Sequence, residues 1–487
     1  MMAHANFMFI RTRILTVILL LAATPAWSRV LLRWSQPSLP APATMGVSDL
    51  VVSWDDAALI RNARRQGYRV YAEVPLVKAA DMARRMAKND LAGIILNPGD
   101  SQPGQIDQAL QQLRSAYPGM PLLVLNPKAK QPEMKGQMVI KREGVLQVTS
   151  PTAQPWVDTN LALVRLDQAF RPSQTPLYEF QWDVSDPQLQ ESGPAPADYA
   201  LAVAEAGAFR ADLVLDLNSR LQTELAQNNP TALAVLNQVK RYLAFASRGQ
   251  KNVGKPDANV GLITDSYQKS YEPINLLARH NIPFAVLKAS DLKPRSLDRF
   301  DLLVVFAAMD DPAMKALADF ASKGGVVVVV DAHGPYPWQS GQPVPAGEHS
   351  VAYVTGKGRI IELQGQVIDP ETFAQDIRSL LDKGQNRDEL ALSLWNALTV
   401  VAVSYQSPGG EKLVELVNYA EEPISVQVRI KGSFSSIRYE TPERACCRPL
   451  TPTRRGAFTE FVVPSLRIAG RVHLASRKPT DHKTEVK

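Results

Sequence analysis

One phrase recurs between residues 47 and 247: a short apolar run ends in a polar or aromatic residue, and a helical pattern follows. This rhythm is typical of parallel βα proteins, whose strands are buried on both faces and therefore form nearly continuous apolar runs. Seven runs fit the phrase, at residues 50–53, 69–72, 93–96, 122–125, 161–165, 177–180 and 212–215. An eighth strand would be 138–141 or 145–148, a stretch that could equally form a small hairpin.

Eight such units in about 200 residues predict a small (β/α)8 barrel, which we favour over an open doubly wound sheet. In a barrel of this kind the C-terminal ends of all strands meet at one mouth. The residues expected there are Trp54, Asp55, Glu73, Asn97, Asn126, Asp167, Glu179, Trp182, Asp183, Asp216 and Asn218. Carboxylates and amides hydrogen-bond hydroxyl groups, and indole faces pack against the C–H face of a pyranose ring, so this set suits a carbohydrate.

Several of these residues also have a structural interpretation. Asp55 could cap the helix that follows it, as could Asn218, and Asn97 and Asn126 precede prolines in loops, where asparagine often accepts local backbone hydrogen bonds. Glu73 and Glu179 differ, because a carboxylate in a buried strand costs several kcal/mol unless it is paired. Each therefore needs a cationic partner or a role at the mouth.

The N-terminal segment has the form of a secretory leader. Arg11 and Arg13 precede an apolar run at 14–23, and Ala26-Trp27-Ser28 follows as a small-x-small triplet. The run of about ten residues is too short for a bilayer that needs roughly 20. We therefore expect a signal peptide at 1–28 and an exported protein, periplasmic or extracellular, with no stable membrane span.

Net charge and motifs exclude several classes of function. The formal charge of +6 falls to +4 without Arg11 and Arg13, which is too weak a basic balance to indicate nucleic acid. No zincin, P-loop or dinucleotide-binding motif occurs. The sequence therefore predicts no cofactor and no metal.

The chain divides into a leader, three domains and a tail. The barrel is expected at 45–248, an α/β domain at 257–385, a β-sandwich at 388–475 and a disordered tail at 476–487. In the α/β domain, helices are expected at 270–280, 311–323 and 370–383, with strands at 283–287, 302–306 and 326–331. Alternating runs at 398–405, 412–418, 424–430, 436–439 and 472–474 predict the sandwich.

The middle domain resembles the class I glutamine amidotransferase-like fold. The residues that carry the resemblance are 271–277, 280–284, 300–305 and the pair Gly324-Gly325 before a valine strand. Amidotransferases use a cysteine nucleophile, and residues 257–385 contain no cysteine, which excludes thiol chemistry there. The phrases 413–419 and 461–464 resemble the terminal domain of secreted glycosidases.

The order of leader, small barrel, amidotransferase-like domain and sandwich resembles family 42 glycoside hydrolases, which are β-galactosidases. The resemblance implies hydrolysis of glycosidic bonds, and a middle domain that supports a homo-oligomer. The family nucleophile is a glutamate on the seventh strand, which Glu179 matches by strand count. The family acid follows an asparagine after the fourth strand, where this chain has Asn126-Pro127.

Two hypotheses for function remain. In the first, the protein hydrolyses a poly- or oligosaccharide, with Glu179 as nucleophile or base and Glu73 as acid; Asp183 and Asp216 are the other candidate partners. In the second, a catalytically inactive barrel binds carbohydrate or acts as a scaffold. A cleft with paired carboxylates would favour hydrolysis, whereas Glu179 tied to an arginine without a second acid would favour binding.

Overall fold

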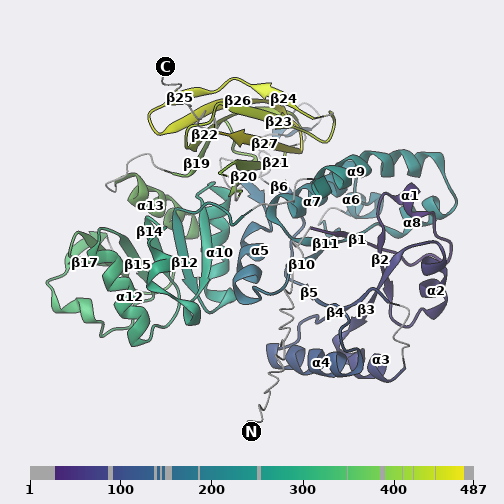
Figure 1. Ribbon diagram of the computed structural model, residues 1–487, viewed down its shortest axis with the longest axis horizontal. Helices are drawn as coiled ribbons and strands as arrows, with labels where there is room; N and C mark the ends of the chain where they lie inside the picture. Colours follow the sequence, from purple (N-terminus) through teal and green to yellow (C-terminus); the bar gives the residue numbers. More distant parts are fainter. Residues whose placement is uncertain are drawn as a thin grey trace, which may run out of the picture.

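The computed structural model describes residues 28–85, 91–135, 140–142, 145–147, 156–184, 187–248, 254–347, 349–383, 390–407, 410–420, 422–444 and 446–476. The predicted leader before Ser28 and the predicted tail after Ser476 lie outside the described residues. Figure 1 shows three bodies: a barrel, an α/β body beside it, and a β-rich body that lies over both.

The barrel is a closed sheet of seven strands in the order β1-β11-β10-β5-β4-β3-β2, all paired in parallel. Its strands are β1 (Val30–Arg33), β2 (Asp49–Ser53), β3 (Arg69–Pro75), β4 (Gly93–Asn97), β5 (Leu122–Asn126), β10 (Leu177–Phe180) and β11 (Asp212–Asp216). The parallel barrel is thus confirmed, but seven strands close it rather than the predicted eight.

One predicted strand of the barrel was wrong, and one strand was missed. Residues 161–165 belong to a helix, α5 (Leu161–Phe170). The stretch considered for the eighth strand forms the small hairpin that was the alternative, with strands β7 (Ile140–Arg142) and β8 (Val145–Gln147). Met138 lies outside the described residues. The missed strand is β1, which lies directly after the predicted leader and before residue 45, where the sequence placed the start of the barrel.

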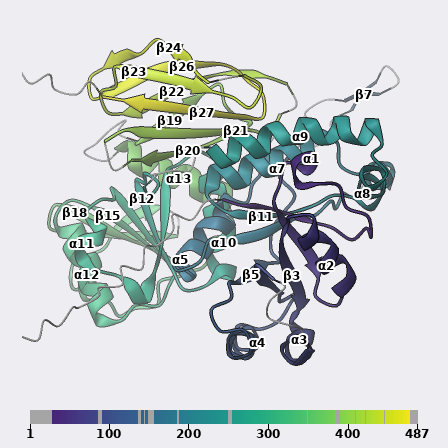
Figure 2. The ribbon, with the colours of Figure 1, turned by 45° about the vertical axis from the view of Figure 1, so that its right-hand side comes forward.

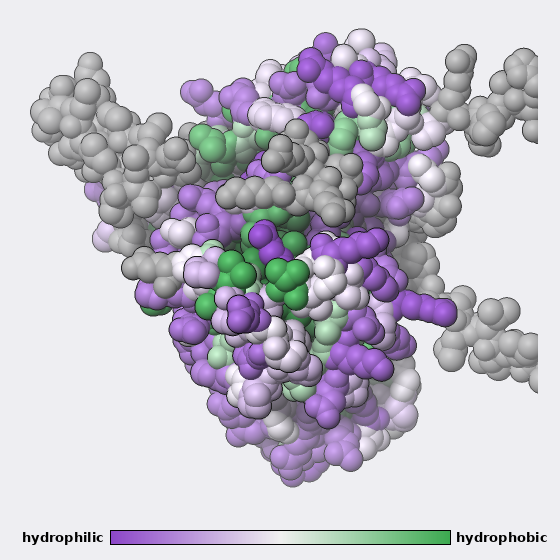
Figure 3. Space-filling view, turned by 90° about the vertical axis from the view of Figure 1, so that its left-hand side faces the viewer, coloured by the Kyte–Doolittle hydropathy of each residue, from purple (hydrophilic) through white to green (hydrophobic). Residues whose placement is uncertain are grey.

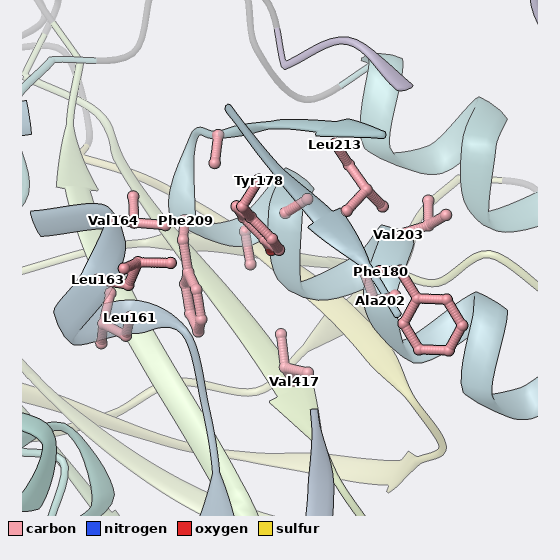
Figure 4. Close-up of a cluster of buried hydrophobic side chains, with 14 of the residues drawn as sticks. Leu161, Leu163, Val164, Tyr178, Phe180, Ala202, Val203, Phe209, Leu213 and Val417 are labelled. Atoms are coloured by element: carbon pink, nitrogen blue, oxygen red, sulfur yellow. The ribbon is translucent and has the colours of Figure 1, made fainter. Parts of the chain in front are cut away.

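Helix α5 resembles a strand in sequence because it has no polar face. Every residue from Leu161 to Asp167 is buried, among them Arg165, whose guanidinium donates to Tyr405 Oη at 3.1 Å. Figure 4 shows Leu161, Leu163 and Val164 packed in the same cluster as Phe209 of the barrel domain and Val417 of the β-rich body. A helix enclosed on all sides loses the 3.6-residue apolar period that would have identified it.

The remaining elements of the first body surround the barrel strands. They are α1 (Pro42–Met45), α2 (Ala57–Arg65), α3 (Ala79–Arg85), α4 (Pro103–Ala116), α6 (Pro187–Ser192), α7 (Pro196–Phe209), α8 (Ser219–Ala226), α9 (Pro230–Arg248), and the hairpin strands β6 (Glu133–Lys135) and β9 (Trp156–Asp158). Between α8 and α9 the chain turns at Asn228, which adopts a left-handed φ of 57°, and Pro230 begins α9.

The middle body is a seven-stranded sheet in the order β13-β12-β14-β15-β18-β17-β16, with helices beside it. The strands are β12 (Val260–Thr264), β13 (Phe284–Lys288), β14 (Leu302–Val305), β15 (Val326–Val330), β16 (Val344–Gly347), β17 (Ser350–Thr355) and β18 (Gly358–Leu363). The helices are α10 (Tyr267–Arg279), α11 (Pro294–Leu297), α12 (Asp311–Ser322) and α13 (Pro370–Lys383). The helices and strands predicted here are present within a few residues.

The C-terminal, β-rich body consists of two antiparallel sheets, β19-β22-β26-β25 and β20-β21-β27-β23-β24, and we call it the two-sheet body. Its strands are β19 (Leu392–Trp395), β20 (Val400–Gln406), β21 (Lys412–Asn418), β22 (Ile424–Lys431), β23 (Ser436–Glu440), β24 (Arg448–Leu450), β25 (Thr453–Arg455), β26 (Phe458–Leu466) and β27 (Ala469–Ala475). Val428 and Phe461 of one sheet share an apolar cluster with Val414 and Val472 of the other, as in a sandwich.

One apolar cluster joins the three bodies, since it includes Phe209, Leu276 and Val417. The two-sheet body lies across α7 and α9 of the barrel domain in Figures 1 and 2. The face shown in Figure 3 is largely hydrophilic, with apolar side chains gathered near its centre. A search of the helices in the described residues found none long and apolar enough to cross a membrane.

Candidate functional site

The side chains at the C-terminal end of the barrel follow from strand alternation. Leu31, Val51, Tyr71, Ile95, Leu125, Leu177 and Val214, one from each strand, form a single apolar cluster, which fills the barrel interior. Successive side chains on a strand point to opposite faces, so the residue two positions later points to the same side. That step leads from Leu31 to Arg33, from Tyr71 to Glu73, from Leu177 to Glu179 and from Val214 to Asp216.

These four residues form one ion-pair cluster, which we call the Arg33 cluster. Arg33 binds Glu73 with two nitrogens, Nε to Oε2 and Nη2 to Oε1, both at 2.9 Å. Its Nη2 also lies 2.6 Å from Glu179 Oε2, and its Nη1 lies 3.0 Å from Asp216 Oδ2. A single guanidinium therefore holds carboxylates from β3, β10 and β11.

Two amides complete the cluster. Asn97, at the end of β4, donates from Nδ2 to Glu73 Oε1 at 2.9 Å, and Gln181 donates from Nε2 to Glu179 Oε1. Both oxygens of Glu73 and both oxygens of Glu179 therefore accept hydrogen bonds within the protein. The side chain of Asp216 is 38% exposed, against 8% for Glu179 and 15% for Glu73, so Asp216 is the carboxylate most open to a ligand.

The charges of the cluster act on one another. Burial lowers the pKa of Arg33, but the charges of Glu73, Glu179 and Asp216 outweigh it, and the pKa lies above its usual value. Burial raises the pKa of Asp216 more than the charge of Arg33 lowers it. Arg33 is therefore permanently charged, and Asp216 is the group here that is shifted toward holding a proton.

Glu73 and Glu179 share one nitrogen of Arg33. Glu73 Oε1 and Glu179 Oε2 lie 2.9 and 2.6 Å from the same nitrogen of Arg33, so the two oxygens are at most about 5.5 Å apart. Retaining enzymes place their carboxyl groups about 5 to 5.5 Å apart, but with the sugar between them. Here a guanidinium, rather than a sugar, lies between the two carboxylates.

The other predicted mouth residues are only partly brought together. Asn97 joins the Arg33 cluster, but the Oδ1 of Asn126 accepts the backbone N–H of Lys128 at 3.1 Å in a local turn. The ring of Trp54 packs on the apolar cluster between β3, β4, α3 and α4, and Trp182 packs on the large cluster that joins the three bodies. Both indole side chains are half-buried.

The four remaining residues of that set lie apart from the cluster. Asp55 is exposed and accepts from Ser53 Oγ, and the helix cap expected of it is made by Asp56 instead, which accepts the N–H of Leu59 at 2.9 Å. Asp183 is exposed, and its backbone N–H faces Gln131 Oε1 at 3.4 Å. Asp167 pairs with Arg171 on α5, and Asn218 caps α8.

Arg33, the centre of the cluster, was not among the residues predicted from the sequence. It lies in the run Val30-Leu31-Leu32-Arg33-Trp34, which has the same form as the other strands but directly follows the predicted leader. Glu73 and Glu179 each needed a cationic partner, and this need was the signal in the sequence that could have identified Arg33. Arg33 ends an apolar run that had not been assigned to a strand.

No metal ligand set lies at the mouth in the part of the chain that the structure describes. Among the described residues, the one group of three potential metal ligands whose ligand atoms lie close together is Glu440, Cys446 and Cys447, in the two-sheet body.

Comparison with known proteins finds likeness at the level of the fold. No known sequence family and no curated protein matches the chain. Among solved structures, α-L-fucosidase isoenzyme 2 from Paenibacillus thiaminolyticus is similar with a TM-score of 0.58 and 11% identity, over 93% of this chain and 100% of that chain. A β-galactosidase from Rahnella sp. R3 is similar with a TM-score of 0.53 and 10% identity, over 89% of this chain and 95% of the other. The chain thus has a glycoside hydrolase-like fold.

Proposed function

We propose that this protein binds a poly- or oligosaccharide at the C-terminal mouth of its barrel and does not hydrolyse it. The observation that carries the proposal is that Arg33 forms ion pairs with both Glu73 and Glu179, the two residues expected to perform the chemistry. The fold supports a carbohydrate as the ligand, because the two similar structures named above are a fucosidase and a β-galactosidase.

The charge of the site indicates the kind of sugar. The Arg33 cluster contains one cation and three carboxylates, and Asp216 is its most exposed member. An acidic sugar would be repelled by this cluster, since like charges in a poorly hydrated site cost several kcal/mol. We therefore propose a neutral saccharide, with Asp216 and the amide of Asn97 contacting its hydroxyl groups.

The test is a binding measurement on a panel of neutral and acidic polysaccharides by affinity electrophoresis. Asp216→Ala should weaken binding of the preferred neutral glycan about tenfold, which corresponds to one lost hydrogen bond of about 1.4 kcal/mol. Asp107→Ala, which removes an exposed carboxylate of α4 on the outer side of the barrel, is the matched control and should bind as the wild type does. If Asp216→Ala and Asp107→Ala bind the glycan equally well, the binding surface lies elsewhere.

Hydrolysis is the second candidate, and the raised pKa of Asp216 favours it. In that case Asp216, rather than Glu73, would donate the proton, and Glu179 would have to leave Arg33 to act as nucleophile. Release of reducing sugar by the wild type that disappears in Asp216→Asn would establish this function. The absence of release from a glycan that the protein binds would exclude it for that glycan.

We also propose that the protein acts after export, supported by the leader-like sequence at 1–28. Fractionation of cells that express the full sequence tests this directly. A shorter protein that begins near Arg29 and is found outside the cytoplasm is the expected result, and a full-length protein retained in the cytoplasm would contradict it. Homo-oligomerisation through the middle body stays a prediction.

A further inference from the structure

A second ion-pair cluster lies at the N-terminal end of the barrel, opposite the mouth. Asp49, Arg69 and Asp212 are the first residues of β2, β3 and β11, and Arg29 directly precedes β1. Arg29 binds Asp212 Oδ2 with two nitrogens, Nε at 3.0 Å and Nη2 at 2.6 Å. Arg69 Nη2 lies 2.6 Å from Asp49 Oδ2. We call these four residues the Arg29 cluster, which shares no residue with the Arg33 cluster.

The main chain of Arg29 is also bound to β11. Its backbone N–H donates to Asp212 Oδ1 at 2.7 Å, and its carbonyl oxygen accepts the N–H of Leu213 at 2.9 Å. The side chain of Asp212 is 0% exposed, and both of its oxygens accept hydrogen bonds from Arg29. These contacts fix the position of the Arg29 main-chain nitrogen beside a buried carboxylate.

The cations of the Arg29 cluster compensate its carboxylates only in part. Burial raises the pKa of Asp212 more than the charge of Arg29 lowers it, and the charge of Asp49 raises it again. Asp49 Oδ1 is buried and has no hydrogen-bond partner among the described residues. The side chain of Arg69 is 57% exposed, so water weakens its charge. A further positive charge at the Arg29 nitrogen is therefore favoured here.

The sequence indicates how such a charge can arise. Arg29 directly follows Ala26-Trp27-Ser28, the small-x-small triplet after which a leader of this form is cleaved. Hydrolysis of the Ser28–Arg29 peptide bond consumes one water molecule. The released leader ends in the new carboxylate of Ser28, and the nitrogen of Arg29 becomes a protonated α-amino group. A neutral N–H with one proton is thereby replaced by a cation with three.

We propose that cleavage between Ser28 and Arg29 creates an α-ammonium group that forms a buried ion pair with Asp212 and stabilises the closed barrel. The inference rests on the proposed export, because a leader peptidase has to perform the hydrolysis. Hydrogen bonds of ionised groups are roughly twice as strong as neutral ones, and the nitrogen already lies at hydrogen-bond distance from the carboxylate. Removal of the leader therefore also strengthens the attachment of β1 to β11.

The test compares two purified proteins, residues 29–487 and residues 28–487, each released from a fusion partner so that its first residue is defined. In the longer protein the nitrogen of Arg29 stays a neutral amide, whereas in the shorter protein it is charged. The equilibrium constant for unfolding in urea at pH 7 should be about tenfold lower for the shorter protein. Because both proteins are purified, this comparison does not depend on whether cells export the chain.

The pH dependence identifies the group responsible. A free α-amino group has a pKa of about 8, and the charge of Asp212 raises it. The advantage of the shorter protein should therefore be present below about pH 8 and be lost as the pH rises through the raised pKa. Asp49, Arg69, Tyr71 and the guanidinium of Arg29 lie around the same site, but both proteins contain them, so their own titration cancels.

Two variants serve as controls. Ser28→Ala in the longer protein removes the hydroxyl that donates to Ala206 O at 3.5 Å, and the shorter protein should be more stable than this variant as well. Asp212→Asn in both proteins removes the charge, so the two lengths should become equally stable. If Asp212→Asn does not fold, the pH profiles decide. Equal stability of the two unmodified lengths at pH 7, or an advantage of the same size at about pH 10.5, would overturn the ion pair.

N-terminal sequencing of the protein recovered outside the cytoplasm tests the cleavage site. A chain that begins at Arg29 is the expected result. A chain that begins at another residue would overturn the cleavage site while leaving the export intact. A full-length protein retained in the cytoplasm would contradict the export itself, which separates the failure of that proposal from the failure of the ion pair.

Discussion

Replacing Arg33 by methionine should destabilise the protein by about 3 to 5 kcal/mol at pH 7, the range measured when one partner of a buried ion pair is removed. The substitution keeps most of the side-chain volume but leaves Glu73, Glu179 and Asp216 facing one another without a cation. Repulsion between these carboxylates and their partial burial then act in the same direction. The measurement is the free energy of unfolding in urea.

The matched control is Arg84→Met. Arg84 pairs with Asp81 on the surface of α3 and is 71% exposed, so its loss should cost less than about 1 kcal/mol. The deficit of Arg33→Met should shrink as the pH falls from 7 toward 5, because Asp216, whose pKa burial already raises, then takes up a proton and its repulsion of the other two carboxylates ends. Equal losses in Arg33→Met and Arg84→Met would show that the cluster does not depend on its cation.

Glu205→Ala should also destabilise the protein by about 3 to 5 kcal/mol, because it leaves buried donors without an acceptor and creates a cavity. Glu205 of α7 is fully buried where the barrel domain meets the two-sheet body. Its carboxylate accepts from Asn160 Nδ2 at 2.7 Å, from Tyr419 Oη at 2.5 Å and from Tyr178 Oη at 3.4 Å. Tyr419→Phe, which removes one of these donors, should cost about 1 to 2 kcal/mol.

The pH dependence of unfolding isolates the charge of Glu205. Burial raises its pKa above the usual value, more than the hydrogen bonds from Tyr419 and Asn160 lower it. The folded protein therefore holds this proton to a higher pH than the unfolded chain does. The corresponding stability is present below pH 4.5, the usual pKa, and is lost as the pH rises above it. Glu205→Gln should lack this decline, and an unchanged pH profile in that variant would contradict the assignment.

Much of the architecture was predictable because strands and amphipathic helices have different periods. Residues 326–330, five consecutive valines, could only be a buried strand, and the helices at 311–322 and 370–383 have clear apolar faces. Helix α5 was not predictable in this way. An amphipathic helix faces a core on one side and water on the other, whereas α5 is covered by residues of three different bodies. Local sequence does not record which distant segments will cover a helix.

The site was predictable in part for a similar reason. Glu73, Glu179, Asn97 and Asp216 were placed at the mouth because they follow or end buried strands, and the structure brings them together. Trp54 and Asn126 end strands as well, but Trp54 packs into a neighbouring apolar cluster and Asn126 accepts a bond within its own loop. The strand determines where the backbone of a residue lies, whereas the contacts of the side chain determine where that side chain points.

Arg33 connects the two hypotheses that the sequence left open. In a glycosidase two carboxyl groups flank the glycosidic bond, whereas here one guanidinium holds both Glu73 and Glu179. Binding without hydrolysis requires the ion pairs to persist when a saccharide is present, since a glutamate released from Arg33 would regain its chemistry.

The most direct test of binding without hydrolysis is a crystal structure of the protein with an oligosaccharide of the preferred glycan. We expect an intact oligosaccharide at the mouth, in contact with Asp216 and Asn97, while Arg33 still holds Glu73 and Glu179. An oligosaccharide bound on another surface, or a cleaved product beside a Glu179 that has moved away from Arg33, would contradict the proposed function.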